Sequence, residues 1–153
     1  MPIHIASRRL SEATLRHRFG DALILDVTSR GPEPWVRFSP FFPHGDIPVP
    51  FMSDSVGASV EGIWQGLKVF EGADVDPGTI ANATMRGIKR TVRRFGRVLG
   101  HREGVGGTRL LAYAEARRRI YLPSYAWVLE HWMQAELAEI HSLANKQTVV
   151  LLD

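Results

Sequence analysis

Apolar residues occur as short compact runs in the first half of the chain and as helical stripes in the second half. The run 22–27 (ALILDV) is short and rich in branched apolar residues, which indicates a buried strand. The same reading predicts a second strand over 35–38 and a closing strand over 148–152 (TVVLL). Several prolines and a glycine between 39 and 50 predict an irregular, rigid loop of the kind that often carries function.

Apolar residues with helical spacing predict the remaining elements. The predicted helices cover 59–70, 79–95, 108–120 and 123–143. Ser59 is a suitable N-cap for the first of them, and Pro123 suits the start of the last. The glycine-rich stretch 96–107 is expected to be mobile. Because helices dominate and strands do not alternate regularly with them, we expect an α+β fold, a single compact, mostly helical domain over 1–153 with a few short strands.

Length and composition exclude several classes of protein. A chain of 153 residues with 44% hydrophobic and 23% charged residues is an ordinary single globular domain. The absence of cysteine excludes thiolate catalysis, disulfides and thiolate zinc sites. The N-terminus lacks the pattern of a signal peptide, and no apolar run is long enough to span a membrane. We therefore expect a cytoplasmic protein with no membrane partner.

Basic residues are clustered although the net charge is only +3. Seven of the residues between 89 and 102 are Lys, Arg or His, and a second group of three arginines covers 117–119. Such clusters suit phosphates or nucleic acid, and a solvated helix face explains them equally well.

One polar stripe on the predicted helix 59–70 has the composition of a reactive site. Glu61, Gln65 and Lys68 are spaced so that they share one helix face, with Glu61 in the first turn, where the helix dipole favours its ionised form. Routine amphipathicity accounts for the same pattern. The alternatives are thus a polar surface face or a cleft lined by a carboxylate, an amide and an amine.

The residues around this stripe resemble the NADAR family, also called YbiA-like proteins. The order Phe38-Ser39-Pro40-Phe41-Phe42-Pro43, followed by Ser59-Val60-Glu61 with Gln65 and Lys68, is similar to the family's aromatic-S-N-F-x-P loop and S-x-E-H-x-x-Q-x-x-K helix. The resemblance covers 38–70, with Pro40 in place of the family's Asn and Gly62 in place of its His after Glu. Gly96-Arg97 and Tyr125-Ala126-Trp127 are weakly similar to later family elements.

The resemblance implies an N-glycosidase that cleaves the bond between a base and ribose in an ADP-ribosyl compound or a ribosylamine phosphate such as a riboflavin precursor. Glu61 is then expected to act as acid, base or stabiliser of positive charge. Lys68 is expected to form a Schiff base with the opened sugar, which requires burial or nearby positive charge to lower its pKa.

Further residues are expected to bind the substrate. Phe41 and Trp64 are suited to stacking on a base, with packing in the core as the alternative. His44 is suited to protonating a leaving base, with simple exposure on the loop as the alternative. Arg97, His101 and Arg102 are suited to phosphate contacts. The resemblance adds Ser39, Gln65 and Trp127 to the binding residues. No histidine lies at a metal-ligand spacing with acidic residues, so we expect neither a metal nor a cofactor.

Two other functions fit the same residues. A non-catalytic module would bind ADP-ribose or another nucleotide in the same pocket without turnover. A nucleic-acid-binding protein would use the basic segment 86–102, and its affinity would depend steeply on salt. ADP-ribosylated nucleic acid is a possible substrate of the enzyme. The leaving base and the oligomeric state are not specified by these patterns.

Overall fold

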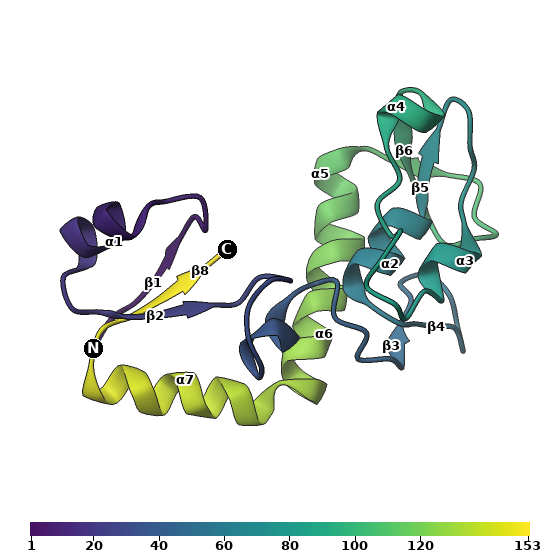
Figure 1. The fold of residues 1–153 in the computed structure, drawn as a ribbon. Coiled ribbons are helices and arrows are strands. Elements are labelled where there is room, and N and C mark those ends of the chain that lie inside the picture. The colour runs from purple at the N-terminus through teal and green to yellow at the C-terminus, as the bar shows by residue number, and fades with distance from the viewer. The chain divides into compact units, whose positions relative to one another are not determined.

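The computed structural model describes residues 1–153, and its internal contacts gather in two compact units (Figure 1). Unit 1 comprises Met1–Ser39 with His131–Asp153, and unit 2 comprises Pro40–Glu130. Each unit combines helices with a small sheet, which confirms the α+β class. A single domain over 1–153 stays a prediction, since clustered contacts alone do not define independent folding.

Unit 1 is built on a three-stranded parallel sheet in the order β1 (Ile3–Ala6), β8 (Val149–Leu152), β2 (Leu23–Asp26). The predicted strands at 22–27 and 148–152 are therefore confirmed, and β1 is an additional strand. Val150 of the central strand is fully buried and packs in a cluster with Ala6 and Leu15. The closing strand thus provides the centre of this sheet because both its neighbours pair with it.

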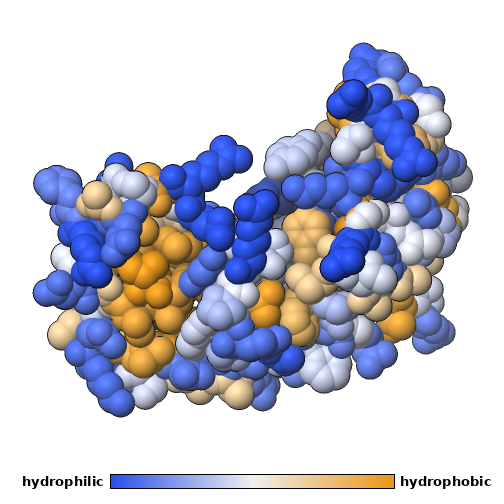
Figure 2. Space-filling view, in the orientation of Figure 1, coloured by the Kyte–Doolittle hydropathy of each residue, from blue (hydrophilic) through white to orange (hydrophobic).

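Two α-helices lie within unit 1. Helix α1 (Glu12–Phe19) begins at Ser11, whose hydroxyl accepts a hydrogen bond from the Thr14 amide at 3.1 Å. Helix α7 (Gln134–Lys146) buries Ile140 and Ala144. Figure 2 shows an apolar area on this unit bordered by polar side chains. None of the helices in the chain is long and apolar enough to cross a membrane.

Unit 2 is organised around helix α2 (Val60–Gly66), in which every residue is buried. An antiparallel sheet lies in the order β5 (Lys68–Phe70), β6 (Val98–Arg102), β7 (Leu110–Leu111), and a second pair joins β3 (Ile47–Pro48) to β4 (Val56–Gly57). Ser59 caps α2 by accepting a hydrogen bond from the Gly62 amide at 2.9 Å, as predicted. The predicted helix 59–70 therefore ends early, and its last residues form β5.

Two glycines allow the short helix α3 (Pro77–Ile80) to pack directly on α2. A Cβ atom at Gly62 would lie 2.9 Å from the Thr79 carbonyl oxygen, and one at Gly66 would lie 2.3 Å from the Ile80 Cγ1 atom. No side chain fits at either place without movement of the neighbouring element. Gly62 therefore follows Glu61 for a packing reason, independent of any role in chemistry.

The predicted strand at 35–38 and the predicted helix at 79–95 are both wrong. The first segment is a 3-10 helix, η1 (Trp35–Phe38), because the Val36 and Arg37 amides donate to carbonyls three or four residues earlier. Most of the second segment is a loop between α3 and α4 (Val92–Phe95). Met85 and Gly87 have positive φ there, which a continuous helix does not permit.

The elements after residue 107 also differ from the helices that apolar periodicity predicts. The predicted helix 108–120 begins as β7 and continues as α5 (Tyr113–Ala116) and a π-helical segment, η2 (Arg117–Tyr121). The predicted helix 123–143 is two helices, α6 (Leu122–Trp132) and α7, separated at Met133. Met133 is fully buried, and its φ of −117° and ψ of 16° interrupt the helix. The apolar periodicity of the sequence does not reveal this interruption, because Met133 keeps its place among the buried residues.

The glycine-rich stretch 96–107 is not a mobile loop throughout, because its first half forms β6. Its second half is fixed by a network of ion pairs. Arg119 Nη1 lies 2.9 Å from Glu103 and 3.1 Å from Glu115, and Arg109 Nη2 lies 3.0 Å from Glu115. Four charged side chains therefore tie this glycine-rich turn to the helical segment that follows it.

Candidate functional site

The predicted stripe of Glu61, Gln65 and Lys68 is a connected chain of side-chain hydrogen bonds. Gln65 Nε2 donates to Glu61 Oε1 at 2.9 Å, and Lys68 Nζ donates to Gln65 Oε1 at 3.2 Å. Glu61 and Gln65 are 8% and 6% exposed, so this is a buried chain and not a solvated face. The amide thus links the carboxylate to the amine.

Arg90 fixes the direction of this chain. Its backbone N–H donates to Gln65 Oε1 at 3.1 Å, which makes that atom the acceptor and leaves Nε2 to donate to Glu61. The Arg90 guanidinium donates to the carbonyls of Gln65, Lys68 and Asp74. Arg90 thereby holds the end of α2 and the start of β5 together.

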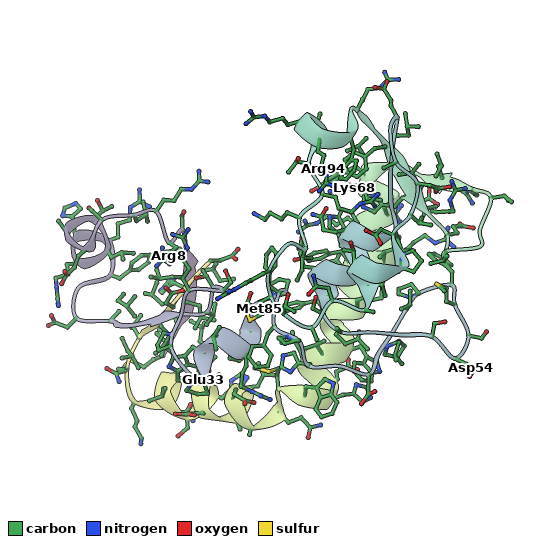
Figure 3. All side chains as sticks on the ribbon, turned by 45° about the vertical axis from the view of Figure 1, so that its right-hand side comes forward. Arg8, Glu33, Asp54, Lys68, Met85 and Arg94 are labelled. Carbon is green, nitrogen blue, oxygen red and sulfur yellow. The ribbon has the colours of Figure 1, made fainter.

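Lys68 is half-buried at the start of β5, where Figure 3 labels it, and its side chain lines an open cleft. Burial lowers the pKa of the Lys68 amine, and the nearby Arg90 charge lowers it further, whereas Glu61 opposes the shift. The net effect is a lowered pKa, so a larger fraction of the amine is unprotonated at neutral pH than in an ordinary lysine.

The cleft has a volume of about 500 Å³ and lies within unit 2. Apolar and aromatic groups make most of its wall, and the Lys68 amine is its cation. Its lining residues are Trp64, Lys68, Val98, Leu99, Gly100, His101, Ala112 and Tyr113. Neither Glu61 nor Gln65 is among them, so the cleft is linked to the carboxylate only through the Lys68 amine and the Gln65 amide.

Trp64 and His101 lie flat against each other at this cleft. Their ring centroids are 3.7 Å apart and their planes differ by 28°. Tyr113 and Tyr121 approach Trp64 edge-on, with centroids 6.0 Å and 5.5 Å from it. One face of Trp64 is therefore occupied by His101 in this structure, which limits the stacking on a base that the sequence predicts for Trp64.

His101 is a buried strand residue directly opposite Lys68 in the β5–β6 pair. Its side chain is 2% exposed, and neither ring nitrogen has a hydrogen-bond partner. Burial, and secondarily the Lys68 charge, lowers the pKa of His101 to about 4, although an interaction with the Trp64 backbone acts in the opposite direction. An uncharged imidazole does not provide the cationic phosphate contact expected of His101.

The two arginines expected to bind phosphate lie outside the cleft lining and have acidic partners. Arg97 Nε lies 3.2 Å from Glu71, and its side chain is strongly exposed. Arg102 Nη2 lies 2.9 Å from Asp74, and its Nη1 donates to the Gly107 carbonyl at 3.1 Å. Both side chains therefore contribute to holding loops in unit 2 as the chain stands.

The remaining predicted binding residues also do not line the cleft. Phe41 is partly buried under Lys89, whose Nζ lies 5.6 Å from the ring centroid. His44 packs on Phe42, with ring centroids 4.7 Å apart.

Two more of these residues lie on other elements. Trp127 is partly buried on α6, and Ser39 belongs to unit 1, where its amide donates a hydrogen bond to the Val36 carbonyl. The loop still reaches α2, because the Glu61 amide donates to the Pro40 carbonyl at 2.9 Å.

Sequence reasoning missed Arg90, Tyr113 and the apolar walls from β6. Arg90 is one basic residue among many in its segment, and only its burial distinguishes it. Tyr113 is 66% exposed, and no motif marks it. The pairing of β5 with β6 brings these distant segments together, and the glycine-rich composition of 96–107 hid that strand.

The fold and the site together define an α+β protein with a lysine-bearing, largely apolar cleft. No group of three or more His, Asp or Glu side chains is placed to hold a metal ion. The chain belongs to DUF6939, a family of unknown function whose model matches residues 7–153. Neither a curated protein nor a solved structure matches the chain.

Proposed function

We propose that unit 2 is an N-glycosidase acting on a ribosyl phosphate or ADP-ribosyl compound, with Lys68 as the nucleophile. The observation that supports this proposal is the Lys68 amine, whose pKa is lowered by burial and which faces a cleft of about 500 Å³. The resemblance of residues 38–70 to NADAR proteins gives the substrate class. The volume of this cleft falls within the range found for small-molecule binding sites in proteins.

The reaction proceeds through an imine. The unprotonated Lys68 Nζ forms a bond to the anomeric carbon C1′, and the bond from C1′ to the base nitrogen breaks. The base keeps that electron pair and gains a proton as it leaves. Nζ loses its proton and the sugar ring opens, which leaves a C1′–Nζ Schiff base. Water then adds to C1′ and expels the amine, so that free base and ribose phosphate are released.

Glu61 and Gln65 support this reaction through their hydrogen-bonded connection to the Lys68 amine. The Glu61 carboxylate is joined to Lys68 through the Gln65 amide and stabilises positive charge on the amine and on C1′. Because Glu61 does not line the cleft, we assign it electrostatic stabilisation in preference to direct proton transfer to the substrate. Proton transfer to the leaving base is left to water or to another group of the cleft.

Reductive trapping tests the nucleophile. Cyanoborohydride added during turnover of ADP-ribosylated guanosine is expected to fix the sugar on Lys68, seen as a mass increase on the peptide that contains it. Lys68→Met removes the amine and is expected to abolish trapping. Lys89→Met provides a matched control, since Lys89 is exposed and lies against Phe41 outside the cleft. Trapping that persists in Lys68→Met contradicts the assignment.

A binding module without turnover is the second function. One observation favours it: the buried Glu61 carboxylate is held by Gln65 and does not line the cleft. The cleft would then bind the ribosyl compound, and Lys68 would contact its anionic or carbonyl oxygens. Measurable binding of ADP-ribosylated guanosine, with neither base release nor trapping, would favour this function.

Nucleic-acid binding by 86–102 has less support. Arg90 is buried, and Arg97 and Arg102 have carboxylate partners, which leaves fewer cations of this segment for phosphates. Salt dependence of oligonucleotide binding is the measurement that tests it.

A further inference from the structure

The two ring nitrogens of His101 are buried polar atoms at the cleft. Both are buried without a hydrogen-bond partner, although His101 is among the residues that line the cleft. A buried polar group left unpaired destabilises the folded state, so a native protein retains one only for a reason. A phenylalanine would keep the stacking on Trp64 without that cost.

The position of His101 relative to Lys68 suggests the reason. The two residues are directly opposite in the antiparallel β5–β6 pair, so their side chains leave the sheet on the same face. Facing Cβ atoms in such a pair are about 5 Å apart. If Lys68 Nζ reaches the C1′ atom of a ribosyl ligand, the group bonded to C1′ lies beside Lys68, on the side where His101 and Trp64 stand.

The neutral state of His101 decides which part of a ligand it contacts. Because it is uncharged above about pH 4, it offers one N–H donor and one nitrogen acceptor and no positive charge. A neutral imidazole offers a phosphate no opposite charge. An uncharged ring that carries hydrogen-bonding groups matches the imidazole and the apolar wall formed by Val98 and Leu99.

We propose that His101 is a specificity-determining residue that hydrogen-bonds the uncharged heterocyclic base of the ligand. The inference rests on the proposed function for the placement of C1′ at Lys68. In the ligand-free chain the imidazole nitrogens are covered, so binding requires a small opening of the wall. Tyr113 is 66% exposed and stands edge-on to Trp64, which makes its side chain the part of the wall that moves most easily.

The test compares a base-bearing ligand with one that lacks the base. Affinities of the wild type and of His101→Phe are measured calorimetrically for guanosine 5′-monophosphate and for ribose 5-phosphate. Loss of one hydrogen bond to the base is expected to weaken guanosine 5′-monophosphate about tenfold and to leave ribose 5-phosphate within about twofold. Val92→Ala, at an exposed position outside the cleft lining, is the control and should leave both affinities unchanged.

Three results would overturn the assignment. They are no change in either affinity for His101→Phe, an equal loss for both ligands, and no binding of guanosine 5′-monophosphate by the wild type. Should His101→Phe fail to fold, His101→Leu removes the same nitrogens and serves in its place. Because the measurement is of binding, a failure of base release or of trapping at Lys68 refutes the enzymatic proposal and leaves this result interpretable.

Discussion

His101 stacks on Trp64 with its ring centroid 3.7 Å away, while both of its nitrogens lack hydrogen-bond partners. The stack joins α2 to β6, the two elements that carry the reactive stripe and the cleft wall. Apolar contact therefore holds the site together at the cost of two unsatisfied polar atoms. This relationship has consequences for stability that can be measured separately from any activity.

Acidification should destabilise the protein through His101. The folded-state pKa of about 4 lies below the ordinary value of 6.5, so the unfolded chain takes up a proton in this range that the folded chain does not. The stability lost on this account between pH 7 and pH 5 is about 2 kcal/mol. Well above pH 6.5, where the imidazole is neutral in both the folded and the unfolded chain, the group should contribute no pH dependence.

His101→Phe isolates this effect from the titration of the carboxyl groups. Urea unfolding of the variant should show a shallower loss of stability between pH 7 and pH 5 than the wild type shows. The free energy of unfolding at pH 7 should be unchanged or higher, since two unpaired polar atoms are removed. Identical pH profiles for the two proteins would mean that His101 is not buried as described.

The contact between α2 and α3 should make Gly66 intolerant of even one added carbon atom. Gly66→Ala places Cβ 2.3 Å from Ile80 Cγ1 and 2.9 Å from the Asp76 carbonyl oxygen. The expected destabilisation is about 1–3 kcal/mol by thermal or urea unfolding. Gly106→Ala is the control, because nothing lies within 4 Å of its added Cβ. Equal stabilities of the two variants would argue against the packing of α3 on α2.

Arg90 should be essential to the structure of the site despite lying in a basic segment. Arg90→Met removes donors to the three carbonyls of Gln65, Lys68 and Asp74, which then lie without their partner. Breaking hydrogen bonds from a buried charged group is expected to cost about 2–4 kcal/mol. The exposed Arg93→Met variant should change stability by less than about 0.5 kcal/mol. Similar unfolding curves for both variants would refute the role of Arg90.

The reactivity of Lys68 should depend on the charge of Glu61. Burial lowers the pKa of the amine and Glu61 raises it, so Glu61→Gln should lower that pKa further. The rate at which cyanate carbamylates Lys68, followed by mass spectrometry across pH, reports this pKa without any turnover. An upward shift in Glu61→Gln would contradict the hydrogen-bonded chain through Gln65. Lys89 in the same samples serves as the exposed reference amine.

Local patterns in the sequence predict the elements whose partners are close along the chain or whose composition is unambiguous. The strands at 22–27 and 148–152 and the Ser59 cap are confirmed for this reason. The spacing of Glu61, Gln65 and Lys68 also predicts their alignment, although Lys68 lies on a strand.

Elements stabilised by distant contacts could not be predicted in this way. The loop that replaces the predicted helix 79–95 is held by Arg90, which donates to residues 16 to 25 positions away. Strand β6 contains Gly100 and has further glycines on both sides, and only pairing with β5 and β7 makes it extended. The cleft wall depends on that pairing, so its residues carry no local signature.

The proposed glycosidase activity is tested most directly by base release. The purified protein is incubated with ADP-ribosylated guanosine, ADP-ribosylated DNA, NAD and a ribosylaminopyrimidine phosphate. The released base, or the product that carries it (guanosine, unmodified DNA, nicotinamide or the aminopyrimidine), is followed by mass spectrometry. Lys68→Met and Glu61→Gln are run beside the wild type, with Lys89→Met as the control. Release of base by the wild type and the control, lost in Lys68→Met and strongly reduced in Glu61→Gln, is the predicted result. Release that is unaffected in Lys68→Met, or no release from any of the four compounds, would contradict the account.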